Sequence, residues 1–215
     1  MKLILEQADD VSFITEATEN GKKNLFIEGC YMVYGQGNKN GRVYSENVMR
    51  KEVNRYLKEV VSEKRAYGEL NHPSGPQINL DRVSHLIEKL EVRPNGVVWG
   101  KAKVLDTPMG NIARGLIEGG ANLGVSSRGL GSLKAGQNGL MEVQDDFRIV
   151  TAADIVADPS APGAFVQGIM ENVDYFYNEN TGEFVEKIKE SVKKMSSRQL
   201  EEQKVKLFEQ FLKSL

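Results

Sequence analysis

Two adjacent serines and one histidine are the residues of this sequence that could form a nucleophilic site. The segment GVSSRGLGS places Ser126 and Ser127 between glycines, and glycines let a substrate approach the backbone closely. His72 lies far upstream in GELNHPSGP, directly before a proline. A serine hydroxyl becomes a good nucleophile when a neighbouring base takes its proton, and histidine suits that task at neutral pH. These residue types therefore permit acyl transfer.

The glycine-rich segment has other interpretations. It does not match the nucleophile elbow G-x-S-x-G, because Gly124 and Gly129 enclose four residues. A phosphate-binding P-loop would end in Gly-Lys-Ser or Gly-Lys-Thr, whereas this segment continues as Arg128-Gly129-Leu130. A glycine-rich strand or bulge without a chemical role is the structural alternative. A phosphate-binding module ranks last, and it would be indifferent to the loss of His72.

A third group should hold the imidazole of His72 in the right tautomer. Asp154 follows an apolar run in TAADIVAD, where an unpaired buried carboxylate would be costly, so we expect it to have a partner. Glu69 lies beside the histidine, and His85 lies in a predicted strand where packing explains it equally well. Asp158, directly before a proline, is more typical of a turn.

The elements that would position these residues can be predicted from periodicity. Apolar residues at helical spacing predict a helix over residues 45–65 with Ser45 as its N-cap. Thr107 and Pro108 begin a shorter helix that ends at a glycine pair. The segments on either side of Pro94-Asn95-Gly96 predict a hairpin. Further strand patterns around residues 24–35, 121–133 and 141–158 favour a largely antiparallel sheet.

The chain divides into three parts by composition. Residues 1–22 are mostly polar and predict a flexible leader that buries little. Residues 23–172 carry the predicted strands and helices and form the core. Residues 173–215 become highly charged, with apolar residues three and four apart, and predict an arm of two amphipathic helices.

Composition also excludes several classes of function. With 28 basic and 30 acidic residues the net charge is −2, which favours neither nucleic acid nor an anionic membrane as a partner. No run of eighteen apolar residues or signal-peptide pattern is present, so we expect a soluble protein that is not exported. The single Cys30 rules out an internal disulfide, and one cysteine with two histidines is too few for a usual zinc site. We expect no metal or other cofactor.

Three motifs in order, GELNHP, GVSSRGLGSL and DIVADPSAP, together with NKNGRVY near the start, resemble one family. They are similar to the prohead core protein proteases of T-even-type tailed phages, capsid-maturation serine proteases related in fold to herpesvirus assemblin. The resemblance covers roughly Leu25 to Ala164. It implies an α+β fold with a mainly antiparallel, β-barrel-like core flanked by helices, to which the helical C-terminal arm is added.

The resemblance also implies roles for individual residues. His72 would be the base, and Ser126 the nucleophile, because the reactive serine of this wider family commonly follows a glycine and an apolar residue; Ser127 stays an alternative. Asp154 would be the third member, with His85 as the herpesvirus-like fallback and Glu69 as a weaker one.

Backbone amides around Arg128 and Gly129 are candidate oxyanion donors. The loss of such a donor typically costs about a hundredfold or more in rate.

The implied substrates are the scaffold or core proteins and the major capsid protein, cleaved inside the assembling prohead in the host cytoplasm, with self-association as a further option. The resemblance implies cleavage after Leu or Ile, any residue, then Glu. This pattern occurs in the predicted leader and arm, which gives the hypothesis of a zymogen that trims itself after Glu6, Glu16, Glu190, Glu202 and Glu209. Matches at Glu88 and Glu142 fall in predicted strands, where a protease could not bind them without unfolding. The alternative is an inactive relative that binds scaffold proteins.

Overall fold

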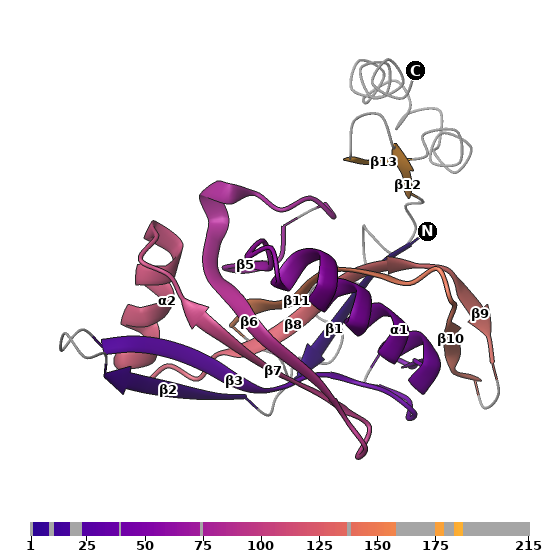
Figure 1. The fold of residues 1–215 in the computed structure, drawn as a ribbon, viewed down its shortest axis with the longest axis horizontal. Coiled ribbons are helices and arrows are strands. Elements are labelled where there is room, and N and C mark those ends of the chain that lie inside the picture. The colour runs from indigo at the N-terminus through magenta and orange to yellow at the C-terminus, as the bar shows by residue number, and fades with distance from the viewer. Residues whose placement is uncertain are drawn as a thin grey trace, which may run out of the picture.

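A computed structural model of the 215-residue chain describes residues 2–8, 11–17, 23–38, 40–73, 75–136, 139–157, 175–178 and 183–186. Its larger sheet has five strands in the order β2-β3-β7-β6-β5, and all neighbours are antiparallel (Figure 1). These strands are β2 (Val11–Ala17), β3 (Lys23–Val33), β5 (Tyr67–Glu69), β6 (Val83–Arg93) and β7 (Val97–Val104). The predicted hairpin around Pro94-Asn95-Gly96 is confirmed as β6 and β7.

A second sheet has three antiparallel strands in the order β1-β8-β11. They are β1 (Lys2–Ala8), β8 (Gly124–Gly131) and β11 (Arg148–Val156), and every residue of the central strand β8 is buried. An isolated parallel bridge between Leu70 and Ile155 joins the end of β5 to β11. This bridge brings the segment after β5 next to the second sheet.

Two α-helices flank the sheets in the described part of the chain (Figure 1). Helix α1 (Glu46–Tyr56) begins at Ser45, whose hydroxyl accepts a hydrogen bond from the Val48 N–H as predicted, and it continues as a π-helical turn η1 (Leu57–Val61). Helix α2 (Pro108–Glu118) begins at Thr107, whose hydroxyl accepts from the Gly110 N–H. The buried side of α1 supplies Val48, Met49, Val53 and Tyr56 to the core.

The remaining elements are small. A short 3-10 turn η2 (Leu80–Arg82) precedes β6. The strands β4 (Arg42–Val43), β10 (Met141–Val143) and β9 (Leu133–Ala135) form a small sheet in that order. A hairpin pairs β12 (Tyr175–Asn178) with β13 (Glu183–Glu186).

Three expectations differ from this architecture. The strands of the described residues form separate sheets and no closed barrel. Residues 2–8 and 11–17 form β1 and β2, although their composition predicts a flexible leader; Ile4 of β1 is 1% exposed and belongs to the core. The described residues of the predicted helical arm form the β12–β13 hairpin, and residues 187–215 lie outside the described part. Strand pairing satisfies the backbone N–H and C=O groups of a segment whether its side chains are polar or apolar. A polar composition alone therefore does not reveal whether a segment is paired.

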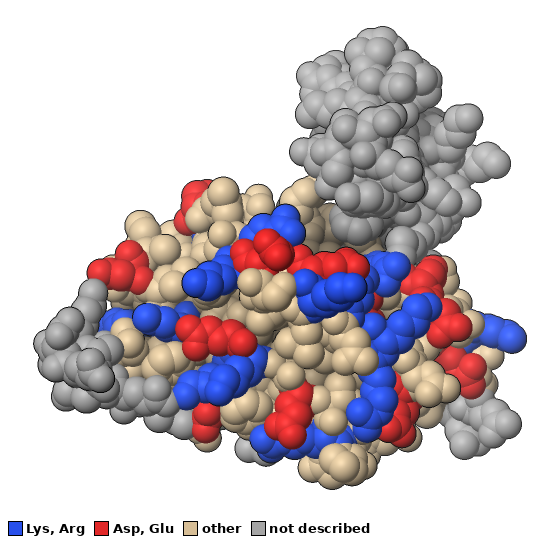
Figure 2. Space-filling view, in the orientation of Figure 1, with Lys and Arg blue, Asp and Glu red and all other residues tan. Residues whose placement is uncertain are grey.

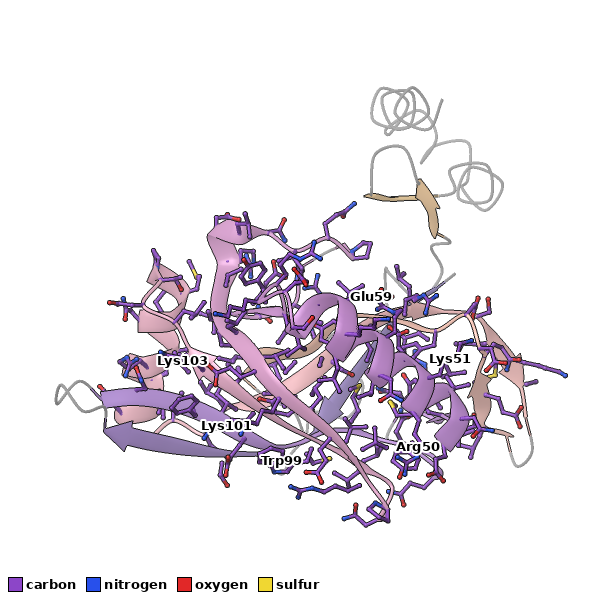
Figure 3. All side chains as sticks on the ribbon, viewed as in Figure 1. Arg50, Lys51, Glu59, Trp99, Lys101 and Lys103 are labelled. Atoms are coloured by element: carbon purple, nitrogen blue, oxygen red, sulfur yellow. The ribbon has the colours of Figure 1, made fainter. Side chains whose placement is uncertain are left out.

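The visible surface mixes charges of both signs (Figure 2). Arg50, Lys51 and Glu59, which Figure 3 labels, are exposed residues of α1 and η1, and Arg50 pairs with Glu46 at 2.6 Å. No helix of the described residues is both long and apolar enough to span a bilayer. The same residues contain no group of three or more His, Cys, Asp or Glu side chains placed to hold a metal ion.

Candidate active site

Strand pairing brings Ser126 and Asp154 together. The two residues are directly opposed in the β8–β11 ladder, and residues paired in this way project their side chains from the same face of a sheet. Arg128, two positions after Ser126, lies on that face as well, and its Nε donates to Asp154. Ser127 falls between them and projects from the other face. The alternation therefore puts Ser126, and not Ser127, on the side of Asp154.

A tight turn after β5 delivers His72 to the same place. The Asn71 N–H donates to the Ile155 carbonyl at 2.7 Å, which anchors the turn on β11. Asn71 has φ +65°, a left-handed conformation that asparagine tolerates better than most residues. Its side-chain oxygen also accepts from the His72 N–H at 3.0 Å. The Asn-His pair of GELNHP thus serves to reverse the chain beside β11.

His72 and Asp154 form a hydrogen-bonded pair. The Nδ1–H of His72 donates to Oδ2 of Asp154 at 2.8 Å, because a carboxylate oxygen can only accept. Asp154 is fully buried and the His72 side chain is 13% exposed. With the proton on Nδ1, the Nε2 atom of His72 is the free acceptor of the ring. This is the tautomer that a general base for a serine hydroxyl requires.

The hydroxyl of Ser126 and Nε2 of His72 are both buried without a hydrogen-bond partner among the described residues. Buried polar atoms without a partner are rare in folded proteins and call for an explanation. Hydrogen bonds between catalytic groups are often long in unliganded enzymes and tighten when substrate binds. A donor and an acceptor that complement each other are thus left free beside the same aspartate.

The Asp154 carboxylate has the partners that its burial demands. Its Oδ1 accepts from the Glu69 N–H at 2.9 Å, and its Oδ2 accepts from Arg128 Nε at 3.1 Å in addition to His72. These three donors offset the cost of removing a charged carboxylate from water. The aspartate is therefore held rigidly from three sides.

Glu69 and the Arg128 side chain have a role that the sequence did not suggest. Glu69 makes no described contact with His72; its carboxylate binds Arg128 Nη2 at 2.5 Å and the backbone N–H of Asn79 at 2.6 Å. Arg128 Nη1 donates to two carbonyls of the loop that follows His72, those of Gly75 and Gln77. The signal for Arg128 lay in its spacing, since a residue two positions from Ser126 in a strand shares its face.

His85 is a core histidine in this structure. Its Nε2–H donates to the Ala153 carbonyl at 2.9 Å, and Nδ1 lies 2.9 Å from the Ser84 hydroxyl. Burial lowers the pKa of His85 to about 4, so its ring is neutral near pH 7. A Cβ atom at Gly68 would lie 2.0 Å from Nε2 of His85, which explains the glycine before Glu69. None of the described contacts of His85 reaches His72 or Ser126.

Gly129 of GVSSRGLGS serves packing. A Cβ atom at Gly129 would lie 2.6 Å from the Phe147 ring and 2.9 Å from the Arg148 carbonyl. The absence of a side chain at Gly129 therefore allows Phe147 and the start of β11 to pack closely against β8. The segment is a strand flanked by β1 and β11, without the loop and helix that a P-loop needs. The oxyanion role of the Arg128 and Gly129 backbones stays a prediction, and both residues have register partners on each side.

The predicted self-cleavage positions fall into two groups. Glu6 and Glu16 lie within β1 and β2, where Glu6 is opposite Ser127 and Glu16 is opposite Asn24. Like Glu88 in β6 and Glu142 in β10, they could reach an active site only if their strands opened. Glu190, Glu202 and Glu209 lie outside the described residues.

Comparisons with known proteins point to one family. Residues 6–174 match the family model described as prohead core protein serine protease. The prohead core protein protease of Enterobacteria phage T4 is 39% identical over 149 residues, which cover 67% of this chain and 69% of the T4 protein. The solved structure of the bacteriophage T4 capsid assembly protease matches with a TM-score of 0.67 and 31% identity, covering 72% of this chain and 97% of that one.

Proposed function

Because the chain belongs to the prohead core protein serine protease family, we propose that it is a serine endopeptidase with Ser126, His72 and Asp154 as its catalytic residues. The observation that carries the proposal is the position of Asp154, which binds His72 and lies opposite Ser126. The unpartnered Ser126 hydroxyl and His72 Nε2 support it further. The three residues come from distant parts of the sequence.

In the first step, Ser126 Oγ attacks the carbonyl carbon of the scissile peptide bond while His72 Nε2 takes the hydroxyl proton. Asp154 keeps the imidazole oriented and stabilises the imidazolium that forms. The tetrahedral intermediate collapses when His72 gives this proton to the leaving amine, and the peptide C–N bond breaks. The products are an acyl-enzyme, in which the amino-terminal part of the substrate is esterified to Ser126, and a free carboxy-terminal fragment with a new amino group.

In the second step, water attacks the acyl-enzyme ester, and His72 takes a proton from that water. The bond between the acyl carbon and Ser126 Oγ then breaks, and His72 returns the proton to the serine. Peptide hydrolysis is therefore complete without a cofactor. The rigid anchoring of Asp154 supports this cycle, because a catalytic group must stay in place through both steps.

The substrates we propose are proteins of the phage prohead. Relatives of the chain are named as a prohead core protein protease and as a capsid assembly protease, which indicates that proteins of the immature capsid are cleaved. We propose scaffold or core proteins and the major capsid protein, cut after Leu or Ile, any residue, then Glu. The location follows from these substrates: the interior of the assembling prohead, within the host cytoplasm.

Self-trimming is proposed for the C-terminal arm. Cleavage after Glu190, Glu202 or Glu209 would remove part of the charged segment, which we propose binds the scaffold before it is cut. Cleavage after Glu6 and Glu16 was predicted because the leader was expected to be flexible. Both residues belong to paired strands, so this reason no longer supports cleavage there. Cleavage there would need β1 or β2 to leave its sheet, so we expect it to be slower.

Cleavage assays with four proteins test the proposal. The wild type, Ser126→Ala, Ser127→Ala and His72→Ala would be purified and incubated with a peptide that carries the ITEA sequence. We expect Ser126→Ala and His72→Ala to lose cleavage after Glu, and Ser127→Ala to keep most of it. Mass spectrometry of the incubated wild type would locate cuts in the chain itself.

The possible outcomes separate the alternatives. Equal cleavage by all four proteins would reject these residues as catalytic. No cleavage by any of them, in the presence of scaffold protein as well, would favour an inactive relative that only binds the scaffold. If Ser127→Ala lost activity and Ser126→Ala kept it, Ser127 would be identified as the nucleophile.

A further inference from the structure

We propose that the buried ion pair between Arg128 and Glu69, called here the Arg128–Glu69 clamp, is the positioning device of the active site. The clamp holds the loop that carries His72 against the strands that carry Ser126 and Asp154. The inference rests on the proposed serine protease function. It adds two residues that act through the catalytic groups and do not contact the reacting atoms.

Arg128 connects three segments through one guanidinium. Its Nε donates to Asp154 on β11 at 3.1 Å, and Nη2 donates to Glu69 at the end of β5 at 2.5 Å. Its Nη1 donates to the carbonyls of Gly75 and Gln77 at 2.8 and 3.0 Å. Every nitrogen of the side chain therefore has an acceptor, and each acceptor belongs to the surroundings of His72.

Glu69 completes the clamp from the other side. Its Oε1 accepts from the backbone N–H and from the Nδ2 of Asn79, at 2.6 and 3.0 Å. Its backbone N–H donates to Asp154 Oδ1 at 2.9 Å. Residues 69 and 79 are thus tied to each other, and His72 lies on the loop between them. The loop cannot move far without breaking bonds to a buried charge.

Energetics indicate that the clamp serves geometry more than stability. Both side chains are completely buried. A buried ion pair is often no more stabilising than apolar side chains of similar size, although the loss of one partner is costly. If these positions only had to fill space in the core, apolar side chains of similar size would suffice. Fixing three segments at once needs the planar set of donors that only arginine provides.

The test compares kcat and KM for peptide cleavage in clamp variants. Arg128→Met should lower kcat by about a hundredfold with little change in KM, because small displacements of catalytic groups cost about that much. Arg128→Lys should recover little, since a lysine retains the charge but not the fork of donors. The milder Glu69→Gln should lower kcat by about tenfold, and it serves as the test if Arg128→Met does not fold.

A double variant separates positioning from stability. Arg128→Met combined with Glu69→Gln removes both charges of the clamp and leaves Asp154 with His72 and the Glu69 N–H as donors, so its free energy of unfolding should exceed that of Arg128→Met alone. If the clamp positions His72, kcat stays low although stability returns. If kcat returned together with stability, the pair would be structural only and the proposal would be overturned.

The chain offers a matched control in Glu52. This carboxylate is 2% exposed, binds Arg55 and Arg148, and accepts from the Ile149 N–H at 2.7 Å. Glu52→Gln should lower stability yet leave kcat within about threefold of the wild type.

A proton NMR signal gives a second readout. The His72 Nδ1–H that binds Asp154 would be identified by its loss in His72→Ala; it should shift in both Arg128 variants and persist in Glu52→Gln.

Failure of the clamp and failure of the proposed function have different signatures. If Ser126→Ala is inactive while the clamp variants keep kcat within about threefold of the wild type, the clamp is overturned and the protease mechanism stands. An equal loss of kcat in Glu52→Gln would also overturn it. If Ser126→Ala cleaves normally, the proposed catalytic function itself is wrong.

Discussion

Ser126 and Asp154 face each other across the β8–β11 ladder, and Asp154 reaches from there to His72 at 2.8 Å. The aspartate is therefore the residue on which the site is built, since it contacts one proposed catalytic group and lies opposite the other. Arg128 and the Glu69 backbone hold its two oxygens in place. Changes around this residue give the most direct tests.

Asp154→Asn should nearly abolish cleavage. An amide would no longer favour the tautomer with the proton on Nδ1 of His72, and the imidazolium would lose its countercharge. We expect kcat to fall by about a thousandfold or more, by analogy with other serine protease triads. Steady-state cleavage of the ITEA peptide measures this. Asp146→Asn is the control, because the hydrogen bonds described for the Asp146 carboxylate are to the exposed Ser132, and it should keep full activity. An active Asp154→Asn enzyme would remove Asp154 from the mechanism.

His85 should make the protein less stable in mild acid. Burial lowers its pKa to about 4, from about 6.5 in an unfolded chain. Below pH 6.5 the unfolded chain binds a proton that the folded chain does not, so the free energy of unfolding falls between about pH 6.5 and 4, by about 3 kcal/mol.

Urea unfolding at several pH values tests this dependence. His85→Gln should have a flatter profile in this range, because it removes the titrating ring. Ser84→Ala should retain the slope, since it removes only the hydroxyl beside Nδ1 of His85. Identical slopes for His85→Gln and the wild type would contradict the assignment.

Gly68→Ala should destabilise the protein. The added Cβ would lie 2.0 Å from Nε2 of His85 and 2.4 Å from the Ala153 carbonyl, so the sheet must shift. Such overpacking typically costs about 1–3 kcal/mol. Gly115→Ala is the matched control, because nothing lies within 4 Å of its added Cβ in the helix α2. It should stabilise by about 0.5–1 kcal/mol. Thermal unfolding of both variants measures the two changes in stability. Equal changes for Gly68→Ala and Gly115→Ala would be inconsistent with the packing around Gly68.

Strand β1 should be needed for stability. Ile4 is 1% exposed, and Ile4→Ala should lower the free energy of unfolding by about 2–5 kcal/mol. Leu80→Ala, at a side chain 72% exposed, should change it by less than about 0.5 kcal/mol. A chain that begins after Glu6 should be destabilised at least as much as Ile4→Ala, because it lacks most of β1. If the shortened chain were as stable as the whole one, β1 would be a dispensable leader after all.

Local signals in the sequence were sufficient for the helices, the hairpin and the residue types of the site. Capping residues, 3.6-residue periodicity and a Pro-Asn-Gly turn act over a few positions, so α1, α2 and the β6–β7 hairpin could be predicted. The motifs that resemble a protease family also lie in short segments, and the chain belongs to that family. The leader was misjudged because pairing of β1 with β8 involves residues far apart in the chain.

The relation of the site residues to one another emerges from the folded chain. Their types, a serine, a histidine and an acidic residue in suitable motifs, could be read from the sequence. Which face of β8 carries Ser126, and which carboxylate meets His72, depends on strand register and on the turn at Asn71. Glu69 and Asp154 were both plausible partners until the fold paired one with Arg128 and the other with His72. Register is set by the packing of the whole sheet, so no single segment contains that information.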